Sequence, residues 1–145
     1  MTLPTITSPE SSDYNCIAWA AEENNRFWWP DPMDTGYWPE NIPREETIES
    51  FIEAYKTLGY ERCYNANLEA GFQKIAIYVK DKKPTHAARQ LNNGKWTSKL
   101  GQSFDIEHKF IKNWTGVKYW LDIEQYDLSK YGKLGCILKR PVSSP

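Results

Sequence analysis

The stretch YNCIAWAA, residues 14–21, decides how this chain is interpreted, because an apolar run that favours a helix begins at a cysteine. Ser11, Ser12 or Asp13 can cap a helix that we expect from Asp13 to Asn24. Apolar residues surround much of this helix, which predicts that it is central and buried. The unpaired N–H groups at a helix start favour negative charge, so this position biases Cys16 toward its nucleophilic thiolate.

A second stretch, THAARQL at residues 85–91, places His86 at the start of a strand-like run. This run and residues 95–100 flank Asn92-Asn93-Gly94, which is a strong hairpin signal because Asn and Gly tolerate the positive φ of tight turns. We therefore expect His86 in an antiparallel sheet. A thiol and an imidazole together are the groups that nucleophilic catalysis by cysteine requires.

Apolar periodicity predicts a second helix that starts at Pro43 and ends at Gly59. Residues 105–114 have apolar side chains at helical intervals, although a strand through Ile106 fits as well. Residues 25–42 form an aromatic-rich loop, because Pro and Gly interrupt the run of rings; these rings either fill the core or form a wall of a cleft. Strands are expected at residues 60–64, 75–79, 117–123 and 134–140.

Length and composition predict a single domain spanning residues 1–145, with residues 1–10 as a loose lead-in. The net charge of -1 and the lack of a basic block make a nucleic-acid partner unexpected. Neither a secretory signal nor a membrane-spanning run is present, so we expect a cytoplasmic protein with no membrane partner. The odd count of three cysteines, without CxxC spacing, predicts free thiols, no metal site and no cofactor.

The order of these pieces resembles papain-like cysteine hydrolases, in which a cysteine on a helix precedes a histidine on a strand. Within that superfamily the chain is similar to the compact bacterial NlpC-like and CHAP-type amidases and peptidases. The resemblance is carried by NCIAWA at 15–20, THAA at 85–88 and GKWTSKLG at 94–101. It implies an α+β, papain-like fold whose N-terminal catalytic helix packs on an antiparallel β-sheet.

The resemblance also implies a division of roles. Cys16 would be the nucleophile, and His86 would lie within about 4 Å of the sulfur to share its proton as a thiolate–imidazolium pair. Backbone N–H groups near the helix start, including that of Cys16, would hold the oxyanion, with Tyr14 or Asn15 as an added side-chain donor.

A third group normally orients the imidazole in such enzymes. In the NlpC-like branch it lies on the strand after the histidine, which here offers Thr97, Ser98 or Lys99, and Ser98 is favoured. A two-residue turn would put Thr97 and Lys99 on the His86 face, whereas a one-residue bulge would put Ser98 there. A CHAP-like alignment favours Asp105 instead, which fits a helix cap equally well.

The function that follows is cysteine-dependent cleavage of a peptide or amide bond, and deamidation or transfer to another amine would use the same groups. His108 is a candidate to line the cleft, although a solvated or structural role fits it, and Lys99 is a candidate anion binder or a solvated strand residue. Two other classes stay open. One alternative to the enzyme is a non-catalytic peptide- or glycan-binding module whose aromatic loop binds the ligand. The other is an interaction protein that acts through a protein partner.

Overall fold

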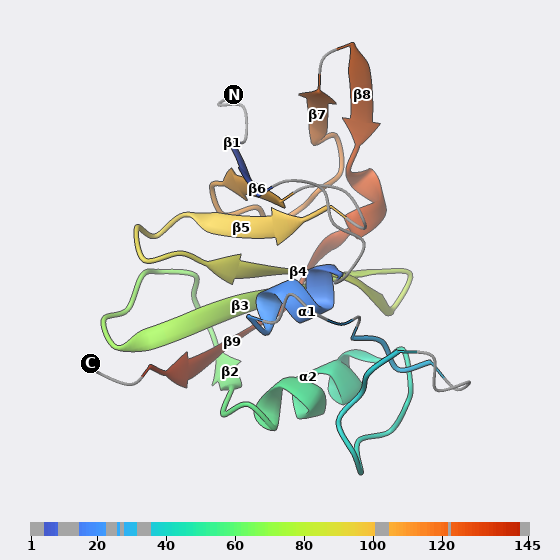
Figure 1. Cartoon of the computed structure of the whole chain (residues 1–145), viewed down its shortest axis with the longest axis vertical. Helices are drawn as coiled ribbons and strands as arrows, with labels where there is room; N and C mark the ends of the chain where they lie inside the picture. The colour runs from blue at the N-terminus through green and yellow to red at the C-terminus, as the bar shows by residue number, and fades with distance from the viewer. Residues whose placement is uncertain are drawn as a thin grey trace.

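An antiparallel β-sheet of seven strands forms the centre of the molecule (Figure 1). The computed structural model describes residues 5–8, 15–22, 26, 28–31, 36–100, 105–121 and 123–142. The strands lie in the order β1-β6-β5-β4-β3-β9-β2, and each neighbouring pair is antiparallel. Their bounds are β1 Thr5–Ser8, β2 Glu61–Cys63, β3 Phe72–Lys80, β4 Lys83–Gln90, β5 Trp96–Lys99, β6 Asp105–His108 and β9 Lys133–Pro141.

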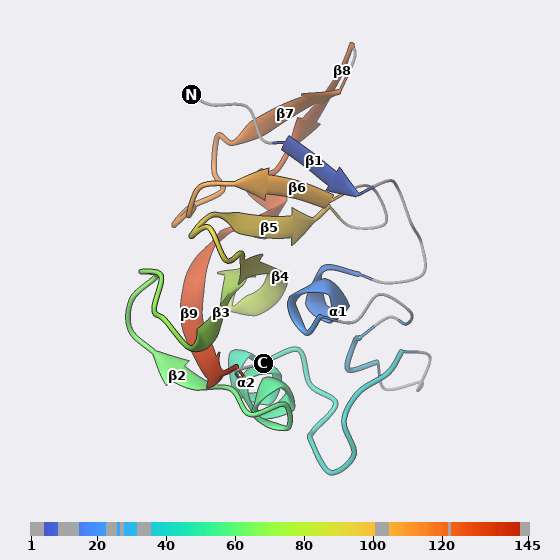
Figure 2. The same cartoon turned by 60° about the vertical axis from the view of Figure 1, so that its left-hand side comes forward.

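Helices α1 (Cys16–Ala20) and α2 (Ile48–Lys56) cover one face of this sheet (Figure 2). The opposite face is covered by the segment that contains the short hairpin of β7 (Lys118–Leu121) and β8 (Glu124–Asp127) and the 3-10 helix η1 (Ser129–Tyr131). Because side chains alternate along a strand, Ile75 and Ile77 pack under the helices, whereas Ala76 and Tyr78 pack on the other side. The mixed α+β class with an antiparallel sheet is thus as expected.

Helix α1 begins at Cys16, later than the predicted start at Asp13, and its cap is Asn15 and not Ser11, Ser12 or Asp13. The Asn15 side chain accepts a hydrogen bond from the N–H of Ala18 at 3.1 Å, which satisfies one of the unpaired donors of the first turn. The helix ends at Ala20, earlier than expected, so it has only five residues. Its residues Cys16, Ile17, Ala18 and Ala20 are buried, as predicted, whereas Trp19 is half-buried.

Helix α2 starts at Ile48 and not at Pro43, because the Thr47 hydroxyl caps it by accepting from the N–H of Ser50 at 3.2 Å. It ends at Lys56, just before the positive-φ Gly59. Its buried face includes Phe51 and Tyr55. The Tyr55 hydroxyl donates to the carbonyl of Ile17 at 2.8 Å, which ties α2 to α1.

Both hairpins around β4 have tight turns. Between β3 and β4, Asp81 and Lys82 occupy positive φ, at 52° and 68°, and thus form a two-residue turn between the paired Lys80 and Lys83. Between β4 and β5, the predicted turn at 92–94 is confirmed, with Gly94 at φ 86° and the N–H of Leu91 bonded to the carbonyl of Lys95. His86 is therefore in an antiparallel sheet, as expected.

Several expectations require correction. Part of the supposed lead-in, residues 5–8, is strand β1 at the sheet edge, where it pairs with β6. Residues 105–108 form strand β6 and not a helix, so the alternative through Ile106 is the correct one. Strand β8 was not expected from the sequence. The strands foreseen at 60–64, 75–79, 117–123 and 134–140 correspond to β2, β3, β7 and β9.

The described part of the aromatic-rich loop has no regular helix or strand, which agrees with the sequence analysis. Trp28 and Trp38 are buried and pack against α2, where Trp38 lies 5.0 Å from Phe51 between ring centroids. These rings therefore belong to the core. Within the described residues, no helix is long and apolar enough to cross a membrane.

Candidate functional site

Cys16 lies at the inner wall of an open pocket with a volume of about 630 Å³. Its side chain is nearly buried, and the backbone N–H of Ala87 in β4 is directed at its sulfur. The start of α1 therefore rests against the strand that carries His86. The pocket is lined by Cys16, Trp29, Glu46, Lys80, Asp81, Lys83, Pro84, Thr85, Lys130 and Tyr131.

Burial controls the protonation of this thiol. It raises the pKa of Cys16 from 9.0 to about 11, although the N–H groups of Ala87, Ile17 and Cys16 itself and the charge of Lys130 act in the opposite direction. Cys16 is therefore a neutral thiol at pH 7 in this structure. The expected thiolate bias of the helix start is outweighed by the loss of solvent, because a five-residue helix has only a small dipole.

His86 is completely buried on the face of the sheet opposite the helices. Its ring stacks on Tyr131, with 3.9 Å between centroids, and meets Trp114 edge-on at 5.3 Å. Neither ring nitrogen makes a hydrogen bond. Burial, together with the charges of His108 and Lys130, holds the pKa of His86 well below 6.5, so the imidazole is neutral at pH 7.

The thiolate–imidazolium pair that the resemblance implies is consequently not formed in this structure. Ala87 belongs to the same buried cluster as Cys16, whereas the ring of His86 contacts members of the other cluster. The physical reason is the period of two along β4, which sends adjacent side chains to opposite faces. Tyr131 contacts the environments of both side chains, since it stacks on His86 and also lines the pocket with Cys16.

The hairpin register decides which third-residue candidates lie on the His86 face. Ser98 pairs with Ala88 and shares that face, whereas Thr97 lies on the α1 face and accepts a hydrogen bond from Trp19 Nε1 at 3.2 Å. Ser98 lies on this face because the turn between β4 and β5 is one residue longer than a two-residue turn, which would have put Thr97 and Lys99 there instead. Ser98 does not contact a nitrogen of His86, because its hydroxyl is bonded to His108.

His108 is a buried structural neighbour of His86 and is not solvated. Its Nδ1 lies 2.7 Å from the carbonyl oxygen of Lys109, which can only accept, so Nδ1 carries the proton. Nε2 must then accept from the Ser98 hydroxyl, also at 2.7 Å. Burial lowers the pKa of His108 from 6.5 to about 4.

Lys99 and Asp105 are both completely buried, so neither is a solvated residue. They are paired directly across β5 and β6, and the alternation of side chains puts them on the α1 face with Thr97. Asp105 is a strand residue and not a helix cap. The structure thus separates both residues from the His86 face.

The Asn15 side chain makes two hydrogen bonds in addition to the one that caps α1. Its Oδ1 accepts from the N–H of Trp28 at 3.1 Å, and its Nδ2 donates to the carbonyl of the same residue at 2.7 Å. The side chain therefore joins α1 to the aromatic-rich loop. Tyr14, the other side-chain candidate for the oxyanion, lies outside the described residues.

Sequence reasoning missed Thr85, Lys130 and Tyr131, which all line the pocket. The Thr85 hydroxyl contacts the carbonyls of Tyr78 and Tyr131, so it fastens the start of β4 to η1. Lys130 and Tyr131 lie far along the chain in an element that had no recognisable pattern. Only the KDKKP turn at 80–84 gave a sequence signal for this part of the pocket.

Among the residues that the structure describes, no three His, Cys, Asp or Glu side chains gather closely enough to hold a metal ion. A search of curated proteins and a search of solved structures each found no match. A family model described as "Domain of unknown function (DUF7689)" matches residues 5–139. Because this match covers nearly the whole chain, the chain belongs to the DUF7689 family.

Proposed function

We propose that this protein is a cysteine-dependent acyl-transfer enzyme of papain-like fold that cleaves a peptide or amide bond. Cys16 is the nucleophile and His86 the base. One observation carries the proposal: the thiol at the start of α1 lines an open pocket, and its sulfur rests against the backbone of β4 next to His86. One further feature supports it. Both ring nitrogens of His86 are buried without hydrogen bonds, and a catalytic role is one explanation for a buried polar group without a partner.

In the proposed reaction the thiol proton moves to the imidazole, and the sulfur attacks the carbonyl carbon of the substrate. The N–H groups of Cys16, Ile17 and Ala87 favour negative charge at the sulfur. The imidazolium then protonates the leaving amine, and water attacks the resulting thioester to release the acid and the thiol. For this transfer the start of β4 has to adopt a second backbone arrangement that brings the imidazole to the α1 side, because this structure holds the ring in the stack on the opposite face.

The experiment that tests this proposal is alkylation with iodoacetamide at pH 7, followed by mass spectrometry of each cysteine peptide. Cys136 is the internal comparison, because burial raises its pKa to about 11 as well. If His86 activates Cys16, the Cys16 peptide is alkylated at least about tenfold faster than the Cys136 peptide, since one pKa unit changes the thiolate tenfold. In His86→Phe, which keeps an aromatic ring beside Tyr131, this advantage disappears.

Equal alkylation of Cys16 and Cys136, unchanged in His86→Phe, contradicts the proposal. That result supports the second candidate, a non-catalytic peptide- or glycan-binding module. The observation in favour of this candidate is that the thiol is neutral and the imidazole is enclosed by aromatic rings. Peptide hydrolysis, deamidation and transfer to an amine all use the same thiol and imidazole, and product analysis with a variant Cys16→Ala as the blank separates them.

A further inference from the structure

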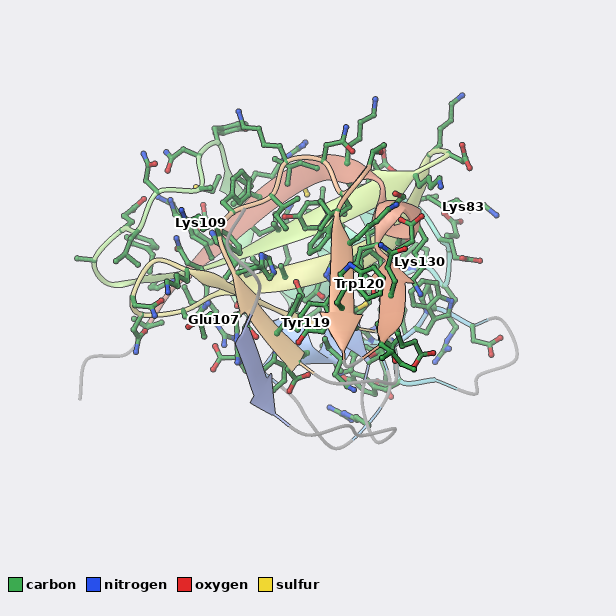
Figure 3. The ribbon with its side chains drawn as sticks, turned by 90° about the horizontal axis from the view of Figure 1, so that it is seen from above. Lys83, Glu107, Lys109, Tyr119, Trp120 and Lys130 are labelled. Atoms are coloured by element: carbon green, nitrogen blue, oxygen red, sulfur yellow. The ribbon has the colours of Figure 1, made fainter. Side chains whose placement is uncertain are left out.

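Three lysines surround the pocket that Cys16 lines. Lys80 and Lys83 flank the turn between β3 and β4, and Lys130 lies in η1. Figure 3 shows Lys83 and Lys130 on the same side of the molecule. Glu46 and Asp81 also line the pocket, so the lysines exceed the carboxylates by one positive charge.

The backbone holds these lysines in place although their side chains reach solvent. The tight turn at Asp81 and Lys82 fixes the hairpin, and the Thr85 hydroxyl bonds it to the carbonyl of Tyr131, next to Lys130. Within the described residues, none of the three lysines makes an ion pair with a carboxylate; Lys130 has its ammonium 5.5 Å from the ring centroid of Tyr131. Lys80 also acts on the nearby carboxylate of Asp127, whereas the charges of Lys83 and Lys130 are available to a ligand.

The positive charge of Lys130 acts on both Cys16 and His86, the proposed reacting groups. Lys130 lowers the pKa of Cys16 and that of His86, as a positive charge close to both groups must. A concave site lined by charge of one sign concentrates ligands of the opposite sign. A ligand in this pocket would thus have its charged group at the lysines and its other end at the sulfur.

We propose that the pocket accepts acyl compounds that carry a single carboxylate near the bond to be cleaved, with Lys80, Lys83 and Lys130 binding that carboxylate. The inference rests on the proposed function and names its substrate class. One negative charge matches the excess of one lysine over the carboxylates Glu46 and Asp81. Lysine suits this task as a mobile point charge that tolerates several carboxylate positions.

The test compares two probes that differ in charge: iodoacetate, which has a carboxylate beside its reactive carbon, and iodoacetamide, which is neutral. Mass spectrometry of the Cys16 peptide gives the ratio of the two alkylation rates. The thiolate fraction affects both rates equally and cancels in this ratio. In Lys83→Glu/Lys130→Glu the ratio is expected to fall about fivefold at low salt, and raising the salt should narrow the difference.

A matched control reverses two charges elsewhere. Lys109→Glu/Lys112→Glu changes the net charge by the same amount, and both lysines are exposed and absent from the pocket; Lys109 lies on the opposite side in Figure 3. Its ratio should equal that of the unaltered protein. Circular dichroism checks that each variant is folded.

An unchanged ratio in Lys83→Glu/Lys130→Glu, or an equal fall in the control, overturns the inference. The two proposals fail in different ways. Rapid alkylation of Cys16 without charge selectivity keeps the enzyme proposal and rejects the carboxylate site. Slow alkylation that still prefers iodoacetate, and loses this preference in the pocket variant, keeps the carboxylate site and rejects the nucleophile.

Discussion

The imidazole of His86 lies almost parallel to the phenol ring of Tyr131, with 3.9 Å between ring centroids and 16° between planes. Tyr131 is itself buried and also lines the pocket beside Cys16. Since neither nitrogen of His86 has a hydrogen bond, the ring contributes to stability only through its contacts with other rings. Burial of these two nitrogens without partners destabilises the folded state, and a catalytic role would explain why a histidine stands here.

Replacing His86 by Phe should therefore leave stability intact or improve it. A buried polar group without a partner costs about 1–3 kcal/mol, and Phe removes that cost, while its larger ring offsets part of the gain. We expect the free energy of unfolding at pH 7, measured in urea, to be at least that of the unaltered protein. A loss of several kcal/mol would mean that the imidazole nitrogens are bonded in the folded protein.

Acid should destabilise the fold through His86 and His108. Both have pKa values below 6.5 in the folded state, whereas in the unfolded chain they titrate near 6.5. As the pH falls below 6.5, the unfolded state binds protons that the folded state does not, so stability decreases. For His108, whose pKa is about 4, the loss between pH 6.5 and 4 is roughly 3 kcal/mol.

Urea unfolding at several pH values checks this expectation. In His86→Phe the slope of unfolding free energy against pH, between pH 6 and 5, should fall by about 1.4 kcal/mol per pH unit, because one titrating group is removed. A flat profile in the unaltered protein over this range would contradict the burial of both imidazoles.

Ser98→Ala should destabilise the protein by about 1–3 kcal/mol, because it leaves the buried Nε2 of His108 without a donor. The specific test is a double-mutant cycle with His108→Leu. Once His108 is gone, removal of the hydroxyl should cost much less, so the double variant is more stable than the sum of the two single changes predicts. Additive effects would show that the two side chains do not interact.

Asn15→Ala should cost about 2 kcal/mol, since it removes the cap of α1 together with the bonds to Trp28. Asn15→Asp is the informative companion. It keeps the oxygen that accepts from Ala18 and Trp28 but lacks the amide donor for the Trp28 carbonyl. Thermal unfolding should therefore rank the unaltered protein first, Asn15→Asp second and Asn15→Ala last, and the reverse order of the two variants would reject this assignment.

Gly132→Ala should prevent stable folding, because Gly132 has φ 74° and a Cβ there would lie 2.0 Å from the carbonyl oxygen of Val79. Gly116 provides the matched control: its φ is 81°, and a Cβ would meet nothing within 4 Å. Gly116→Ala should cost only about 1 kcal/mol from backbone strain. Soluble yield and thermal unfolding of the two variants measure the difference, and similar behaviour would argue against the close approach of η1 to β3.

The elements that sequence predicted correctly are those whose signals are local. The turn at 92–94 follows from the need for positive φ at Gly94. The presence of α1 follows from an apolar run preceded by polar residues, although its start was expected at Asp13 and lies at Cys16. Residues 105–108 misled the helix prediction because their apolar spacing fits two periods. Pairing of β6 with β5 across a loop, and with β1 from far along the chain, decided in favour of the strand.

The sequence by itself determined that Cys16 lies in the opening turn of a helix and that His86 lies in an antiparallel strand, because capping and turn formation depend on neighbouring residues. Only the tertiary structure decided the surroundings of these two side chains. The register of β4 sends the imidazole to the face opposite α1, and the packing of η1 adds Lys130 and Tyr131 to the pocket. Register and burial arise from contacts between segments far apart in the chain, and no local pattern encodes them.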